Sequence, residues 1–454
     1  MHNKTIKILA LALPLVALAG CGGTSDSTPV EAGNVLNIRA WNDEFQGRFR
    51  NYYPDYVSTN TAGDEDTLTD GTIVKWTIVA NEGNAYQNAL DGALENRASQ
   101  PADQRVDMFL MEADYALKYV ESEDTMDISE LGITTANLSD QYQYTKDIVT
   151  DSEGKIKGSS WQATPGLFAY RRDMAEAVLG DDDPDFVQTK LADWDKFDTV
   201  AADMKDAGHY MLSGFDDAYR TFSNNVEAPW VDANKKIVID DSILSWIEQT
   251  KTYTDEEYNN QTSLWSPEWT TDQGPEGNVF GFFYSTWGIN FTLLGNALED
   301  KDGEKEVGNG DFGNWAVVKG PASYYWGGTW LAAVEGTDNA ALVKDIMLKL
   351  TMDKDIMKQI TLDTEDFTNT VSGMTEIAND DSYGSAFLGG QNHIKLFVES
   401  AQNIDMSNIA PYDQGLNEGI QSAFRDYFLG TITEAQAWEN FYTAALDKYP
   451  ALER

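Results

Sequence analysis

Between residues 35 and 120, short apolar runs alternate with segments of helical periodicity. The apolar runs cover 35–41, 72–80 and 106–111, and each has the length of a strand. Helical patterns lie between and after them, at 45–53, 84–98 and 114–120. A strand–helix–strand alternation of this kind predicts a parallel α/β layer. The polar stretch 54–71, rich in Thr, Asp and Gly, is predicted to be a surface loop.

Chain length and cysteine content constrain how such a fold is stabilised. The 454 residues exceed what one compact core accommodates, so we expect two domains or one bilobal body. Cys21 is the single cysteine, which leaves no partner for a disulfide within the chain. Stability must therefore come from burial of the hydrophobic residues, which make up 42% of the sequence.

The N-terminus has the pattern of a secretory signal. A short basic head with Lys4 and Lys7 precedes an apolar run over 8–19, and small residues follow. Leu-Ala-Gly-Cys21 resembles a bacterial lipobox, in which a lipid is attached to the cysteine and cleavage precedes it. We therefore expect a lipoprotein signal peptide at 1–20 and a lipidated flexible tether at 21–34.

Charge and histidine content exclude several classes of function. The formal net charge is −43, and a field of that sign repels a phosphate backbone, which argues against nucleic acid as a partner. Only three histidines occur, so catalytic triads and histidine-rich metal sites are poorly supplied. The segment 64–71 faintly resembles a calcium loop but lacks the ligand at its twelfth position. We expect neither a metal nor a cofactor.

Six motifs, in order along the chain, resemble those of a known family. They are Ile38-Arg-Ala-Trp-Asn-Asp43, Val106-Asp-Met-Phe-Leu-Met-Glu-Ala-Asp114, Gly154-Lys-Ile-Lys-Gly-Ser-Ser-Trp-Gln-Ala-Thr-Pro165, Trp194-Asp-Lys-Phe197, Phe283-Tyr-Ser-Thr-Trp287 and Trp326-Gly-Gly-Thr-Trp-Leu-Ala-Ala-Val334. Their order and spacing behind a lipobox resemble the extracellular solute-binding proteins of carbohydrate ABC importers, the maltose-binding-protein-like group. The resemblance covers nearly all of the chain after the tether.

The resemblance implies a periplasmic-binding-protein-like type II fold, with two α/β lobes joined by a multi-strand hinge and a ligand cleft between them. Lobe 1 is expected to comprise 35–164 and 321–372, and lobe 2 to comprise 165–320 and 373–454. The chain would cross between them near 164–166, 319–321 and 370–373. At the first two crossings Gly and Pro also interrupt strand pairs.

The resemblance also implies particular cleft residues. The family's cleft aromatic falls on Trp287, its acidic residue after the third strand on Asp114, and its Glu-x-Tyr pair on Asp217 and Tyr219. The loop after the first strand contributes Asp43 and Glu44. This chain departs from the maltose binder at Met111, where that protein has an aromatic residue, and at Thr164, where it has an acid.

Further aromatic residues are cleft candidates because of their positions. An aromatic ring matches the apolar face of a pyranose, while carboxylates and amides bind its hydroxyls. Trp161 and Trp326 lie at strand ends or beside glycine, where loops would face a cleft, and Tyr325 and Tyr412 are weighed evenly between cleft and core.

Together these features predict a monomeric, non-enzymatic, lipid-anchored protein on the extracytoplasmic face of the cell membrane. It would capture an oligosaccharide and deliver it to the permease subunits of an ABC importer. Two alternatives stay open: a tethered glycoside hydrolase, whose two carboxylates would stand about 5 to 9.5 Å apart, and a surface carbohydrate adhesin.

Overall fold

The computed structural model describes residues 33–454 of the chain. Cys21, the signal peptide and most of the tether lie outside the described residues. Within the described part, no helix combines the length and apolar character needed to cross a membrane.

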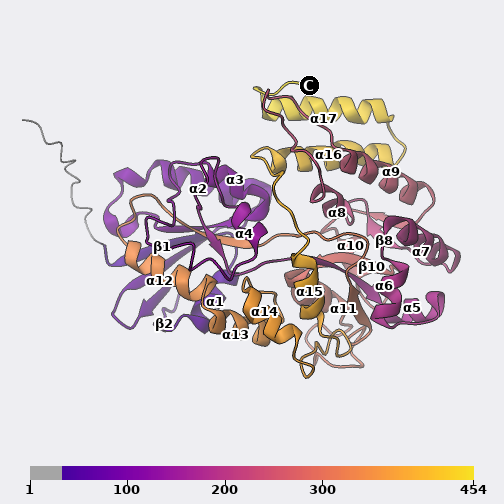
Figure 1. Ribbon diagram of the computed structural model, residues 1–454, viewed down its shortest axis with the longest axis horizontal. Helices are drawn as coiled ribbons and strands as arrows, with labels where there is room; N and C mark the ends of the chain where they lie inside the picture. Colours follow the sequence, from indigo (N-terminus) through magenta and orange to yellow (C-terminus); the bar gives the residue numbers. More distant parts are fainter. Residues whose placement is uncertain (1–32) are drawn as a thin grey trace, which may run out of the picture. The chain divides into compact units, whose positions relative to one another are not determined.

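A seven-stranded mixed sheet organises the first part of the fold (Figure 1). Its strand order is β2-β3-β4-β1-β5-β12-β6, in which β1 pairs in parallel with β4 and β5. The predicted parallel layer is therefore present. The late strand β12 adds to it antiparallel to β5. The strands are β1 (Val35–Ala40), β2 (Tyr56–Thr59), β3 (Glu65–Leu68), β4 (Ile73–Ile78), β5 (Met108–Glu112), β6 (Ser159–Ser160) and β12 (Thr329–Ala333).

Helices cover both faces of this sheet because its strands alternate their side chains between two cores. Leu110 of β5 packs with α1 (Glu44–Tyr52) and α12 (Ala340–Thr351) in one core, whereas Phe109 packs with α2 (Ala85–Glu95) in the other. In Figure 1 the orange α12 and indigo α1 accordingly lie across the sheet from α2 and α3 (Ala116–Val120).

The prediction that 54–71 is a surface loop is wrong, because this segment contains β2 and β3. Asp66 of β3 is fully buried and accepts hydrogen bonds from Arg50 Nε (3.0 Å), Thr59 Oγ1 (2.6 Å) and Trp76 Nε1 (2.7 Å). An aspartate is normally exposed, but these donors from three other elements make its burial tolerable.

The second part of the fold is built on a three-stranded antiparallel sheet, in the order β10-β7-β11, and a parallel pair, β8-β9. Every residue of β7 is buried, and this strand is the central one of the three-stranded sheet. The strands are β7 (Gly166–Arg171), β8 (Leu212–Gly214), β9 (Asn259–Thr262), β10 (Gly281–Ser285) and β11 (Trp315–Val318).

The remaining helices surround these sheets. A capping box between Thr433 and Gln436 begins the last helix, and the apolar stripe Leu416, Ile420 and Phe424 of the helix before it is buried. The helices are α4 (Gln143–Asp147), α5 (Arg172–Leu179), α6 (Pro184–Lys190), α7 (Trp194–Asp206), α8 (Tyr219–Ser223), α9 (Asp241–Asp255), α10 (Pro267–Asp272), α11 (Leu294–Ala297), α13 (Lys354–Thr364), α14 (Val371–Ala378), α15 (His393–Ala401), α16 (Asp413–Phe428) and α17 (Glu434–Lys448).

Three chain segments lie side by side where the two parts meet. Residues 161–166 pair along one edge with 366–369, through Gln162 and Thr368, and along the other with 324–326, through Pro165 and Tyr325. Within this junction Gly166 is required, because a Cβ atom there would lie 2.0 Å from the ring of Tyr324. The fold is thus two α/β lobes that the chain joins more than once.

Candidate ligand cavity

A cavity of about 450 Å³ lies between segments of the two lobes. Its size falls within the range of small-ligand sites. The lobe with the seven-stranded sheet contributes the turn after β5, including Asp114, and the other lobe contributes most of the rest. Lining side chains from that second lobe and from the junction include Asp217, Tyr219, Arg220, Trp265, Trp269, Tyr325, Trp326, Asp413 and Asn417.

An ion pair crosses the cavity from one lobe to the other. Arg220 of α8 donates from Nη1 and Nη2 to the two oxygens of Asp114, at 2.9 and 2.8 Å. The guanidinium also lies 5.3 Å from the ring centre of Trp326, which adds a cation–π contact. This two-pronged geometry fixes the relative position of the two groups more tightly than a lysine contact would.

The electrostatics around this ion pair shift the pKa values of two neighbouring acids, Asp114 and Glu112, in opposite directions. Desolvation opposes charge on both partners, although the Asp114 side chain is still 41% exposed, and their mutual attraction outweighs it, so that the pKa of Asp114 is lowered and that of Arg220 is raised. Burial, and then repulsion from Asp114, raises the pKa of Glu112 to about 8. The surroundings therefore favour the charged form of Asp114 and the neutral form of Glu112.

Asp217 and Tyr219 line the cavity, although their polar atoms have partners within the protein. Asp217 Oδ2 accepts from the backbone N–H groups of Ser213 (2.9 Å) and Gly214 (2.8 Å), and Oδ1 accepts from Trp269 Nε1 (2.9 Å). Burial raises the pKa of this carboxyl to about 7. Asp217 thus holds the cavity wall in place.

An aromatic cluster forms one wall of the cavity. Trp265 is 55% exposed, and its ring stacks on Trp287 at 6.1 Å with an interplanar angle of 24°. Trp287 is half-buried, packs edge-on against Trp326 and donates from Nε1 to the Trp326 carbonyl (2.9 Å). Trp326 stacks in turn on Tyr284. Trp287 therefore supports the wall, and Trp265 presents the exposed face.

Trp265, Arg220 and Asp413 were not found by sequence reasoning. Trp265 has a backbone φ of +68°, a conformation that a bulky residue rarely adopts and that often marks functional positions. The signal available in the sequence was its place directly before Ser266-Pro267, which begins α10 as N-cap and first helical residue. No comparable local signal marks Arg220 or Asp413.

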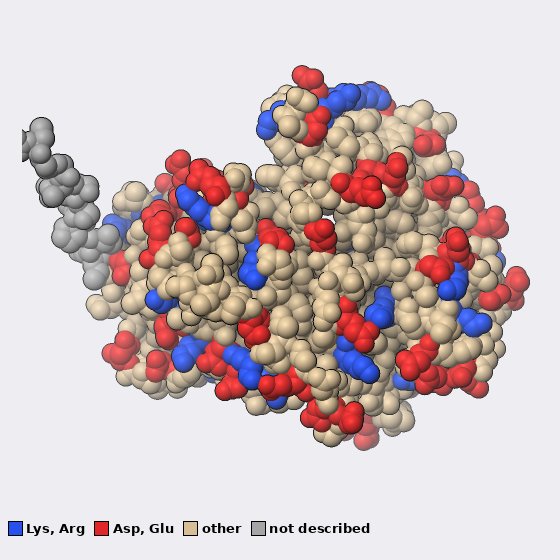
Figure 2. All heavy atoms as spheres, in the orientation of Figure 1, with Lys and Arg blue, Asp and Glu red and all other residues tan. Residues whose placement is uncertain are grey.

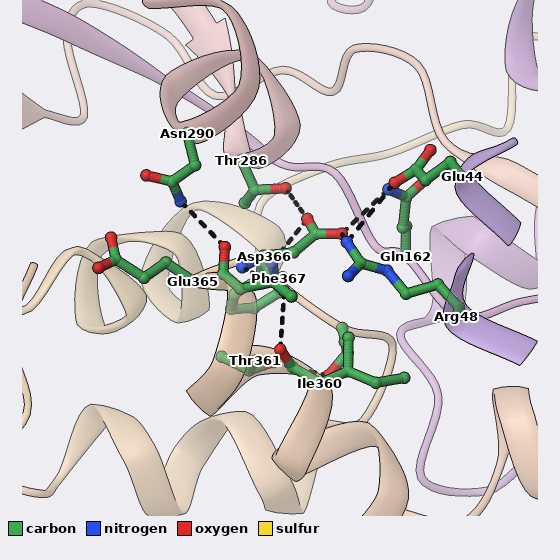
Figure 3. A network of polar contacts seen from close by, with 12 residues as sticks. Glu44, Arg48, Gln162, Thr286, Asn290, Ile360, Thr361, Glu365, Asp366 and Phe367 are labelled. Atoms are coloured by element: carbon green, nitrogen blue, oxygen red, sulfur yellow. Dashed lines mark hydrogen bonds and ion pairs between the residues drawn. The ribbon is translucent and has the colours of Figure 1, made fainter. Parts of the chain in front are cut away.

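Glu44 belongs to a separate polar network away from the cavity lining (Figure 3). Gln162 Nε2 donates both to Glu44 Oε1 (2.8 Å) and to Asp366 Oδ2 (3.0 Å). Asp366 Oδ1 accepts from Thr286 Oγ1 (2.6 Å), and Arg48 lies within 4 Å of both carboxylates. Burial, followed by repulsion from Asp366, raises the pKa of Glu44 to about 7.

Three other predicted residues lie outside the cavity lining. Trp161 is 1% exposed and stacks on Phe45 at 5.1 Å in the core beneath the seven-stranded sheet. Tyr412 accepts a hydrogen bond from Lys235 Nζ (3.1 Å) at the surface, and Asp43 is exposed just before α1. Of the predicted set, the structure brings together Asp114, Asp217, Tyr219, Tyr325 and Trp326, with Trp287 directly behind them.

Comparison with known proteins identifies the class to which this fold and cavity belong. Residues 66–385, more than half of the chain, match the bacterial extracellular solute-binding proteins, and the chain belongs to that family. Extracellular solute-binding proteins act outside the cytoplasm, which gives the location of this chain in general terms. No curated protein sequence matches it.

Solved structures share the fold at low sequence identity. A crystal structure of an extracellular solute-binding protein of family 1 aligns with a TM-score of 0.70 at 18% identity, covering 91% of this chain and 99% of the other. The ABC-transporter-associated binding protein of B. animalis subsp. lactis Bl-04, in complex with beta-1,6-galactobiose, aligns at 0.65 with 17% identity, covering 92% and 98%. The galacto-N-biose-/lacto-N-biose I-binding protein of Bifidobacterium longum aligns at 0.63 with 14% identity, covering 92% and 96%.

Proposed function

We propose that this protein captures an oligosaccharide in the cavity between its lobes and delivers it, without cleaving it, to the permease subunits of an ABC importer. The observation on which the proposal rests is the composition of the cavity wall, which combines the exposed ring of Trp265 with polar groups of Asp114, Arg220 and Asn417. Such a wall matches the apolar face and the hydroxyl rim of a pyranose. The sugars bound by the two bifidobacterial neighbours support the same class of ligand.

Capture would proceed by closure of the lobes around the ligand. We assign 35–164 with 321–372 to one lobe and 165–320 with 373–454 to the other, joined by the paired segments around Pro165. The Asp114–Arg220 ion pair spans the two lobes and would favour the closed form, because its partners come from opposite sides of the cavity. A monomer suffices for this action, since both walls belong to one chain.

Lipid attachment at Cys21 would keep the protein at the extracytoplasmic face of the cell membrane. The lipobox pattern supports cleavage after residue 20, and the polar tether 21–34 would let both lobes reach the permease. More than one acyl chain is needed for stable anchoring, as lipoprotein modification provides.

Isothermal titration calorimetry with a panel of neutral oligosaccharides tests the proposal. Trp265→Ala removes the exposed stacking face, and we expect it to weaken sugar binding by about tenfold. The matched control is Phe291→Ala, which removes an aromatic ring that is 84% exposed and outside the cavity lining, and should bind like the wild type.

If Trp265→Ala and the wild type bind the sugar with equal affinity, the role proposed for Trp265 in the cavity wall is wrong. Appearance of shorter sugars when the same panel is incubated with the protein would instead indicate the hydrolase alternative.

A further inference from the structure

The cavity lining contains side-chain amides whose orientation is fixed by the protein itself. They are Asn224, Asn408, Asn417 and Gln421. Each of them bonds, through one end of its amide, a partner that can only donate or can only accept. The partner therefore decides whether the free end of the amide is an NH2 donor or an oxygen acceptor.

Asn417, in α16, has a free donor. Its Oδ1 accepts from Trp230 Nε1 (2.9 Å) and from the Tyr219 hydroxyl, and both of these partners are buried. An indole N–H can only donate, so the atom that it meets must be the amide oxygen, and the amide cannot turn over. The Nδ2 atom has no hydrogen-bond partner among the described residues and is not one of their enclosed polar atoms. Because Asn417 lines the cavity, this NH2 group is available to a ligand there.

The other amides of the lining are fixed in both senses. Asn224 Oδ1 accepts from the backbone N–H of Tyr325 (2.8 Å), which leaves its NH2 group as a second free donor. Asn408 Nδ2 donates to the Val226 carbonyl (2.9 Å), and Gln421 Nε2 donates to a backbone carbonyl of its own helix (3.0 Å), so these two leave oxygens free. The lining thus combines fixed donors with fixed acceptors, as the hydroxyls of a sugar require.

The charge of the cavity favours a neutral acceptor for these donors. Six acidic side chains line the cavity, whereas Arg220 is the one lysine or arginine among the lining residues that the structure describes. Arg220 is already committed to Asp114 through two hydrogen bonds. Figure 2 shows that acidic side chains are also spread over the surface of the molecule. A carboxylate or phosphate would be repelled by this charge, whereas a sugar oxygen would not.

We propose that Asn417 is a specificity-determining residue, whose Nδ2 donates a hydrogen bond to a neutral oxygen of the captured sugar. This inference rests on the proposed function, because it names a contact to the sugar that the same cavity takes. Trp230 and Tyr219 act as positioning residues, since they hold the amide oxygen and so turn the NH2 group outward. At this position the cavity accepts a group that can accept a hydrogen bond and disfavours one that cannot.

Calorimetry at pH 8 with modified disaccharides tests whether Asn417 donates. Cellobiose, maltose, lactose and gentiobiose are titrated first, and the one that binds most tightly is then replaced by its monodeoxy and monodeoxyfluoro derivatives. A deoxy derivative lacks the hydroxyl at one ring position, and a fluorine atom there restores a weak acceptor but no donor. At the position that meets Asn417, we expect the wild type to bind the fluoro derivative about threefold more tightly than the deoxy derivative.

Asn417→Asp reverses the role of the side chain and keeps its contacts within the protein. One carboxylate oxygen can still accept from Trp230 and Tyr219, and these two donors favour the charged form at pH 8. The other oxygen replaces the NH2 group and repels a fluorine atom. We therefore expect the order to invert at the same ring position, with the fluoro derivative bound at least about threefold more weakly than the deoxy derivative. The unmodified disaccharide should still bind, because its hydroxyl can turn and donate to the carboxylate.

Asn379→Asp is the matched control, because it adds the same charge at an exposed asparagine outside the cavity lining. It should keep the wild-type order of the two derivatives. Thermal unfolding of both variants is measured alongside, and Asn417→Asp should unfold close to the wild type because the bonds from Trp230 and Tyr219 are kept. A change in stability alone would weaken all derivatives together and would not invert their order.

The possible outcomes separate this inference from the proposed function. Inversion of the order in Asn417→Asp but not in Asn379→Asp supports the assignment. A wild type that binds no fluoro derivative more tightly than the matching deoxy derivative overturns it and leaves sugar capture standing, and this result needs no variant. An unchanged order in Asn417→Asp has the same meaning. If none of the four disaccharides binds, the role of Asn417 is overturned, while the wider panel of neutral oligosaccharides still decides whether the protein captures a sugar.

Discussion

Thr286 connects the two lobes through a single buried hydrogen bond, and its loss should measurably weaken the fold. Thr286 follows β10, the strand at the edge of the three-stranded sheet, whereas its acceptor Asp366 lies in the junction segment that pairs with Gln162. The Oγ1–Oδ1 distance is 2.6 Å, and the two residues are 0% and 3% exposed. The variant Thr286→Val keeps the shape of the side chain and removes its donor.

The expected loss follows from the partners that remain. A hydrogen bond to a charged acceptor contributes about 1.5–3 kcal/mol. Asp366 Oδ1 still accepts from the backbone N–H of Phe367 (2.9 Å), so the carboxylate oxygen is not left without a donor. We therefore expect the lower end, a decrease of about 1.5–2 kcal/mol in the free energy of unfolding.

Urea denaturation of the wild type, Thr286→Val and Thr286→Ser measures this decrease. The serine variant keeps the hydroxyl and loses one methyl group, so it should be destabilised by about 1 kcal/mol or less. A valine variant as stable as the wild type, or more stable than the serine variant, would refute the assignment of the stabilising contribution to the Thr286–Asp366 hydrogen bond.

Two further predictions concern Glu44 and Cys21. The pKa of Glu44 rises from an ordinary 4.5 to about 7 on folding, so the folded state binds more protons in that range and stability falls as the pH increases through it. The wild type should therefore lose unfolding free energy between pH 5 and pH 8, and Glu44→Gln should lose less. Because the Glu44 side chain is 30% exposed, we expect the two losses to differ by only about 1–2 kcal/mol. Urea denaturation of both proteins at both pH values measures this difference, and equal losses would contradict the assignment to Glu44. Cys21→Ala should move the protein from the membrane fraction to the soluble fraction with ligand binding intact, which cell fractionation followed by calorimetry checks, and retention in the membrane fraction would argue against the lipobox.

Local patterns in the sequence were sufficient to predict the three strands of the parallel layer, the helices between them and the α/β class. The runs at 35–41, 72–80 and 106–111 form the neighbouring strands β1, β4 and β5. These predictions succeed because side-chain periodicity depends on residues a few positions apart. Asp66 shows the limit of such reasoning, since its burial depends on donors from Arg50, Thr59 and Trp76 in three other elements.

The composition of the cavity was decided by the tertiary structure. Trp161 was predicted at a cleft, yet its ring stacks on Phe45 in the core, while the unpredicted Trp265 presents the exposed aromatic face. Asp114 and Arg220 are 106 positions apart and meet only because the two lobes face each other across the junction. The sequence by itself determined the three strands of the parallel layer and which family the chain resembles. Which loops converge on the cavity depends on contacts between distant segments that no local pattern records.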